Sequence, residues 1–172
     1  MHKLIGQGLG LNPDMGGTVV EPAKHRLPAN RHSLYAISGW LDEEVAELAI
    51  GKLGIFSFRR GLYVYVGSAR RNPRARIGRH LRTEKTMRWH FDYLRPHLRI
   101  VGVDTFPGDE GECRLFRRLM EACGGTVPVR GFGSSDCGCE AHLFYVPRAA
   151  DPIPAGVLAG GTGFPVYPIP QE

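Results

Sequence analysis

The stretch Gly61-Leu-Tyr-Val-Tyr-Val-Gly-Ser-Ala69 is the most informative part of this sequence. Apolar and aromatic residues alternate up to Gly67, a pattern that predicts a β-strand. Asn72 and Pro73 follow and favour a helix start, because asparagine caps helices and proline suits their first position. The sequence therefore predicts a strand that leads directly into a helix over 73–83.

The rest of the chain adds further strands and helices, so we expect one mixed α+β domain. Residues 41–58 are ambiguous, because their acidic start favours a helix and the alternation over 55–58 favours a strand. The other elements follow from runs of β-forming residues and from helical spacing. They are strands over 33–38, 98–105 and 142–146, and helices over 86–97 and 109–123.

We expect three parts along the 172 residues: a flexible N-terminal arm over 1–31, a folded domain over 32–148 and a loose tail over 149–172. Both ends are rich in proline and glycine and lack a steady hydrophobic period. No apolar stretch approaches the roughly 18 residues that a membrane span needs. The N-terminus has no apolar segment of secretory length, so we expect a cytoplasmic protein without a membrane partner.

Positive charge is concentrated in one region of the chain. Residues 59–99 hold 12 of the 22 Lys and Arg but only 2 of the 17 Asp and Glu, so this region carries +10 and the rest −5. Eleven of the 12 cations are arginine, whose planar fork pairs with phosphate oxygens. A solvated cationic face is the plainer interpretation, and a nucleic-acid-binding surface is the sharper one. The candidate contacts are Arg70, Arg71, Arg79, Arg82, Lys85 and Arg88.

Several residues in or beside this region have the chemistry of a phosphate site. Arg76 and His80 share one face of the predicted helix. Arg76 suits a phosphate, and His80 suits a phosphate contact or a proton relay, with a plain surface position as the alternative. Tyr35 and Tyr65 lie on two predicted strands. We expect nearby arginines to favour the phenolate and so make one tyrosine a base, the alternative being ordinary packing on a half-buried sheet.

Glu112 lies four residues before Phe116 in the last predicted helix, a spacing that turns it toward the packed face. A lone inward carboxylate suits a divalent metal that keeps most of its waters, such as Mg²⁺. The alternative is an acid that complements the dipole at the helix start. In the loop over 131–137, Ser134 and Ser135 are candidate phosphate contacts, or simply part of a tight turn.

The four cysteines are Cys113, Cys123, Cys137 and Cys139. Their number in a chain of this length is not typical of a disulfide scaffold, so we expect free thiols in a reducing compartment. Cys137, Cys139 and His142 are metal-like in type, and Cys113 or Cys123 would complete a set of four. One residue between Cys137 and Cys139 is tighter than the usual zinc spacing, which leaves zinc as the alternative to buried free thiols.

The segment 33–145 resembles the GIY-YIG endonuclease domain. The resemblance is carried first by Ser33-Leu-Tyr35 and Tyr65-Val-Gly67, and then by Arg76, His80 and Glu112. A compact subgroup of that family is closer still. The motifs of this closer match are Gly51-Lys-Leu-Gly54, Tyr63-Val-Tyr-Val-Gly-Ser-Ala69, Arg79-His-Leu81, Trp89-His-Phe-Asp-Tyr-Leu94, Glu112-Cys113, Gly131-Phe-Gly-Ser-Ser-Asp-Cys137 and His142-Leu-Phe-Tyr145.

The resemblance implies a small three-stranded antiparallel sheet flanked by helices, here with an extra C-terminal loop and strand. It implies one divalent ion, Mg²⁺ or Mn²⁺, and hydrolysis of DNA, branched or damaged DNA included. Arg76 would bind the scissile phosphate and Glu112 would hold the metal. By the same resemblance, Tyr35 or Tyr65 would activate a water molecule. His80 and His90 would assist in catalysis.

One departure from the family motif matters for activity. Ser33 stands where the GIY-YIG motif has its first glycine. A side chain at this position can crowd a tyrosine whose ring would otherwise lie across a glycine backbone. This departure motivates a second interpretation, in which the fold is kept for nucleic-acid binding without cleavage. A third interpretation is a structural protein stabilised by a metal on Cys137, Cys139 and His142.

Overall fold

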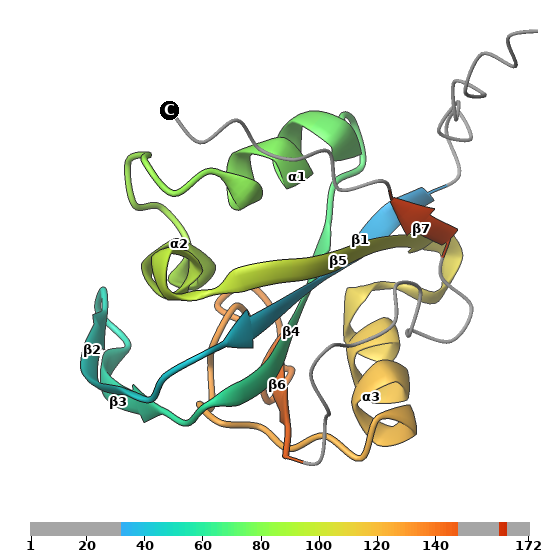
Figure 1. The fold of residues 1–172 in the computed structure, drawn as a ribbon. Helices are drawn as coiled ribbons and strands as arrows, with labels where there is room; N and C mark the ends of the chain where they lie inside the picture. Colours follow the sequence, from blue (N-terminus) through green and yellow to red (C-terminus); the bar gives the residue numbers. More distant parts are fainter. Residues whose placement is uncertain (1–31, 148–161, 165–172) are drawn as a thin grey trace, which may run out of the picture.

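The computed structural model describes residues 32–147 and 162–164 and has the mixed α+β architecture that the sequence predicts. Figure 1 shows a central sheet with helices α1 and α2 on one face and α3 on the other. Within the described residues, no helix has the length and apolarity to cross a membrane. The predicted arm over 1–31 lies outside the described residues.

The sheet contains five strands in the order β6-β4-β1-β5-β7, and every pair is antiparallel. The strands are β1 (His32–Leu41), β4 (Gly61–Ser68), β5 (Arg99–Pro107), β6 (Leu143–Val146) and β7 (Thr162–Phe164). The three central strands and the extra strand β6 agree with the sequence-based expectation. The strand β7 does not, because it lies within the segment that was expected to be a loose tail. A three-residue strand forms by pairing with an existing edge, here β5, and local sequence does not encode that edge.

The ambiguous residues 41–58 form a separate antiparallel hairpin of β2 (Val45–Ile50) and β3 (Gly54–Phe58). The acidic residues before it belong to a bend and do not start a helix. Gly51 and Gly54 both have positive φ, which allows the tight connection between the two strands.

The helices are α1 (Pro73–Leu81), α2 (His90–Leu94) and α3 (Glu112–Ala122), with 3₁₀ turns at Arg95–His97 and Gly108–Glu110. The start of α1 is as predicted, since the Asn72 side chain accepts a hydrogen bond from the N–H of Ala75 at 3.0 Å. The helix predicted over 86–97 is shorter than expected. Pro96 has no N–H to donate, and α2 gives way to a tighter turn there.

Alternation along the strands divides the core into two clusters. In β1, Tyr35 packs in the cluster that contains Ile77 of α1, and its neighbour Leu34 packs in the cluster that contains Leu115 of α3. The same alternation in β4 places Tyr65 in the first cluster. Both candidate tyrosines therefore lie on the face of the sheet that α1 and α2 cover.

Candidate functional site

The candidate residues gather where β4 ends and α1 begins. In the pairing of β1 with β4, Tyr35 stands opposite Gly67, and Ile37 stands opposite Tyr65. A Cβ added to Gly67 would overlap the hydroxyl and the ring of Tyr35. Gly67 therefore allows the Tyr35 ring to lie directly across the backbone of β4.

The bare backbone that Tyr35 crosses belongs to Gly67, not to residue 33. Ser33 continues the strand pairing instead, because its carbonyl accepts a hydrogen bond from the N–H of Ala69 at 2.7 Å. The serine at the first motif position is thus compatible with the observed position of Tyr35.

Tyr35 and Tyr65 are both buried, with 1% and 6% of their surface exposed. Burial raises the pKa of both phenols far above its usual value, and this effect exceeds the opposing influence of Arg76. Arg76 does favour the phenolates, as predicted, but the expectation that one tyrosine would ionise readily is wrong, because burial outweighs the arginine. Both side chains are neutral near pH 7, so each can donate a hydrogen bond but neither is a ready base.

Arg76 and Glu112 approach this pair of tyrosines from different helices. On one side, Arg76 stacks on Trp89, whose ring contacts His80, and His80 contacts both tyrosines. On the other side, Glu112 is bound by Ser68 at the end of β4, next to the glycine that Tyr35 crosses. Arg76 is exposed on α1, and its guanidinium lies 4.7 Å from the centroid of the Trp89 ring. The predicted phosphate-binding arginine therefore has an oriented side chain that solvent can reach.

The carboxylate of Glu112 has a partner at each oxygen. The Ser68 hydroxyl donates a hydrogen bond to Oε2 at 2.6 Å, and Nδ1 of His142 lies 2.8 Å from Oε1. Burial alone would raise the pKa of Glu112, but His142, Ser68 and the charge of Arg76 outweigh it and lower the pKa below its usual value. The carboxylate is therefore ionised at neutral pH, and 26% of its side chain is exposed.

His80 is neither a surface residue nor a charged phosphate ligand. Only 1% of it is exposed, and its ring centroid lies 5.8 Å from that of Tyr35, 5.3 Å from Tyr65 and 4.9 Å from Trp89. Burial lowers the pKa of His80 to about 3, despite the nearby carboxylate of Asp92. The neutral ring packs between the two tyrosines and suits a positioning role, so the expected surface alternative is wrong.

His90 contacts the loop over 131–137. Its Nδ1 accepts a hydrogen bond from the N–H of Gly133 at 3.0 Å, and burial lowers its pKa. Gly133 has a positive φ of 77°, and a Cβ there would come within 3.0 Å of the Tyr65 ring. The structure thus gives His90 a part in holding this loop against Tyr65, and its catalytic role stays a prediction.

Two of the predicted nucleic-acid contacts are occupied inside the protein. Asp92 is fully buried, with Nη1 of Arg79 at 3.1 Å and Nζ of Lys85 at 2.9 Å from its carboxylate. Lys85 also donates to the carbonyls of Arg79 and His80 at the end of α1, and 6% of its side chain is exposed. Ser134 is buried as well. These positions correct the expectation that Arg79, Lys85 and Ser134 are available to a nucleic acid.

The other candidate contacts are on the surface. The exposed ones are Arg70, Arg71, Arg82, Arg88 and Ser135. Beside them, α1 borders an open hollow of about 490 Å³, and its lining residues are Asn72, Arg74, Ala75, Gly78, Arg79 and Arg82. Arg74 and Arg82 make this hollow cationic, since the charge of Arg79 is paired with Asp92, and a cationic hollow suits an anionic ligand.

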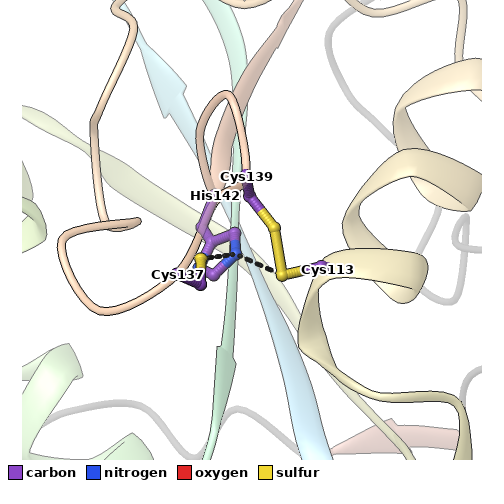
Figure 2. A group of neighbouring side chains, drawn as sticks. All are labelled: Cys113, Cys137, Cys139 and His142. Carbon is purple, nitrogen blue, oxygen red and sulfur yellow. Dashed lines mark hydrogen bonds between the residues drawn. A yellow bond between two sulfur atoms is a disulfide. The ribbon is translucent and has the colours of Figure 1, made fainter.

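Cys113 and Cys139 form a disulfide, with their Cα atoms 6.1 Å apart. This finding corrects the expectation of four free thiols. The two residues are 26 positions apart in sequence and meet only because α3 begins beside the loop that precedes β6. Cys137 is free and exposed, and Cys123 is free and half-buried. Figure 2 shows Cys113, Cys137 and Cys139 around the ring of His142.

Residues 35–157 match the model of a family described as a domain of unknown function, DUF123. The chain belongs to the DUF123 family. The match begins at Tyr35 and includes Tyr65, Arg76, Glu112 and the cysteine cluster, so the site lies within the DUF123 domain. None of the curated proteins matches the chain, and none of the solved structures does.

Sequence reasoning missed two residues of this DUF123 site. Ser68 was passed over because its role appears only when the end of β4 meets the start of α3, 44 residues later. Asp92 did leave a signal, since it is one of only two acids in the cationic region over 59–99. A single acidic residue among so many cations is a good candidate for a buried ion-pair partner of those cations.

Proposed function

We propose that this DUF123 chain is a divalent-metal-dependent endonuclease that hydrolyses phosphodiester bonds in DNA, with a site of the GIY-YIG type that its sequence resembles. The observation that carries the proposal is that Tyr35 crosses Gly67 at the end of β4, where Ser68 binds Glu112, while Arg76 is linked to Tyr35 and Tyr65 through the stacked rings of Trp89 and His80. Four separate elements, β1, β4, α1 and α3, each supply one of these side chains.

Phosphodiester hydrolysis needs charge stabilisation on the phosphate, an activated water and help for the leaving oxygen. Arg76 suits the first task, because arginine stays charged and its fork matches phosphate oxygens. Its stacking on Trp89 limits the directions in which the guanidinium can point. The hollow on α1 and the exposed arginines beside it would hold the flanking phosphates.

Glu112 fits the ion that the resemblance implies, Mg²⁺ or Mn²⁺. Its carboxylate is ionised, partly exposed and held from two sides by Ser68 and His142. A single acid suits an ion that keeps several waters and takes further oxygens from a substrate phosphate. When bound, such an ion supplies positive charge to the phosphate and increases the acidity of a water.

The tyrosines serve as neutral donors in this proposal. The Tyr35 hydroxyl lies over the bare backbone of Gly67 and can orient a water or a phosphate oxygen by hydrogen bonding. His80 fills the space between Tyr35 and Tyr65 and keeps both rings in place. Conversion of either tyrosine to a base would require substrate or metal to offset the effect of burial.

The test is a nicking assay of the full chain on plasmid, branched and damaged DNA with Mg²⁺ or Mn²⁺. Glu112→Gln and Arg76→Ala are expected to lower the cleavage rate by roughly 100-fold or more, because each removes a group that stabilises charge in the transition state. The matched controls are Glu121→Gln and Arg117→Ala, exposed residues of the same types on α3, which should keep the wild-type rate. Full activity in the Glu112 and Arg76 variants would reject the proposal.

A nucleic-acid-binding module without cleavage is the second candidate. The burial of both phenols and the two partners of Glu112 favour it, because these contacts also suit purely structural roles. In that case DNA binding would weaken steeply with salt, and no metal would produce nicks.

A further inference from the structure

Four side chains with metal-binding atoms meet beside the proposed phosphate site. Cys113, Cys137, Cys139 and His142 each offer one ligand atom, and these atoms all lie within 4.8 Å of one another. Figure 2 shows Cys113 reaching from the start of α3 and the other three coming from the loop that leads into β6. The cluster therefore joins the third helix to this loop.

The imidazole of His142 faces the sulfur atoms. Its Nε2 lies 3.6 Å from Sγ of Cys113 and 3.6 Å from Sγ of Cys137. In a tetrahedral zinc site with Zn–N of about 2.0 Å and Zn–S of about 2.3 Å, a nitrogen and a sulfur lie about 3.5 Å apart. Both observed separations are close to this value, so a shared zinc ion would need little movement of His142 relative to either sulfur.

The other nitrogen of the same ring faces a carboxylate. Nδ1 of His142 lies 2.8 Å from Oε1 of Glu112, which is an ion-pair distance without hydrogen-bond geometry. Histidines that bind metals usually give their second N–H to such a partner, which leaves the lone pair of Nε2 for the ion. The backbone of His142 is held on both sides, by the carbonyl of Phe132 at 2.7 Å and by the N–H of Val66 at 2.9 Å. The ligand is thus oriented before any metal arrives.

We propose that Cys113, Cys137, Cys139 and His142 bind one Zn²⁺ ion when the disulfide is reduced. The disulfide and the ion use the same two sulfurs, so the two states exclude each other. A dithiol reductant would transfer two electrons and two protons to the bond between Cys113 and Cys139 and become a disulfide itself. Zinc would then displace one proton from each of three thiols and bind the neutral imidazole.

This zinc site is structural, because three thiolates and one imidazole leave no open position for a substrate. Bound zinc links the start of α3 to the loop over 131–137 and, through His142, orients the carboxylate of Glu112. The zinc ion is distinct from the ion proposed for DNA cleavage, which would bind Glu112, and the two sites meet at the contact between His142 and Glu112.

The experiment uses the full chain. The protein is reduced with a dithiol, the reductant is removed in the absence of air, and zinc affinity is then measured by titration with Zn²⁺ in competition with a chelator. Elemental analysis should find one Zn²⁺ per folded chain in the reduced protein and none in the disulfide form. Cys137→Ser removes an exposed ligand outside the disulfide and should lower zinc affinity by at least roughly 100-fold. The matched control, Cys123→Ser, removes a free cysteine outside the cluster and should bind zinc as the wild type does.

Two results would overturn the zinc site: reduced, folded wild type that binds no zinc, or equal affinity in the two variants. Circular dichroism shows whether Cys137→Ser folds. If that variant does not fold, the absorption spectrum of Co²⁺ bound to the reduced wild type tests the site instead. Thiolate ligands give charge-transfer absorption that oxygen and nitrogen ligands lack. A cobalt spectrum without thiolate bands overturns the proposal, whereas the nicking assay of Glu112→Gln and Arg76→Ala tests the proposed cleavage separately.

Discussion

Tyr35 lies across Gly67, its cross-strand partner in the pairing of β1 with β4, so closely that any side chain at position 67 would displace the phenol. The hydroxyl of Tyr35 consequently reaches the end of β4, where Glu112 accepts a hydrogen bond from Ser68. Gly67 of β4 thus determines where the hydroxyl of Tyr35, on the neighbouring strand β1, lies.

Gly67→Ala is expected to destabilise the protein by about 1–3 kcal/mol, because the added Cβ overlaps the buried Tyr35 ring. Urea unfolding measures the loss. Gly102→Ala is the matched control in another strand, where a Cβ meets nothing within 4 Å. That variant should be unchanged or up to about 1 kcal/mol more stable, because alanine restricts the unfolded chain. Equal losses in the two variants would contradict the close contact.

The burial of His80 predicts a stability that falls in mild acid. An unfolded histidine titrates near about 6.5, whereas burial lowers the pKa of His80 in the fold to about 3. Between these values the unfolded chain binds a proton that the folded chain does not, so stability falls as the pH falls through this window. The slope from this group is at most about 1.4 kcal/mol per pH unit.

His80→Phe should remove that slope, because phenylalanine keeps a ring among Tyr35, Tyr65 and Trp89 but does not titrate. Urea unfolding at about pH 7 and about pH 5 provides the comparison. His97→Gln, at an exposed position, serves as the control and should leave the wild-type dependence in place. An unchanged slope in His80→Phe would show that other groups control the acid response.

Asp92→Asn should be among the most damaging polar substitutions in the chain. The carboxylate accepts hydrogen bonds from the N–H groups of Arg88 and Trp89 at 2.9 and 3.1 Å and pairs with Arg79 and Lys85. Loss of its charge leaves two partly buried cations without their counter-ion, which costs about 3 kcal/mol or more.

Asp42→Asn provides the control for this loss of charge. Asp42 pairs with Arg99 at 3.2 Å, and both side chains are about half exposed, at 59% and 48%. Exposed pairs contribute little, so the free energy of unfolding should change by less than about 1 kcal/mol. Thermal and urea unfolding of the two variants should therefore differ clearly, and similar small losses would contradict the structural role of Asp92.

Arg82→Gln should weaken the proposed DNA binding and reduce its salt dependence. Arg82 is exposed beside the hollow on α1, and each phosphate contact adds about 0.9 to the slope of log K against log salt. Fluorescence anisotropy over a range of salt concentrations measures this slope. Arg117→Gln makes the same change of charge on α3, on the opposite face of the sheet, and should leave the slope unchanged. Equal effects would indicate binding driven by net charge alone.

Local sequence was enough to predict the elements around the site. Alternation placed β4, and Asn72 with Pro73 placed the start of α1, because strand periodicity and helix capping depend on neighbouring residues. The same reasoning placed Arg76 and His80 on α1, but only the structure showed that Arg76 is exposed and His80 is buried. The ambiguous segment over 41–58 was not resolved, since its hairpin depends on the pairing of two strands that are each weakly marked.

The amino-acid sequence by itself determined the α+β class, the main strands and helices, and the types of side chain available for chemistry, since all of these follow from local preferences. The tertiary structure alone decided which ionisable groups are charged and which cysteines form a disulfide. It buried His80 and both tyrosines, which reversed the expected ionisation, and it brought Cys113 to Cys139. Desolvation and long-range contacts depend on the packing of distant segments, and no local pattern of residues encodes them.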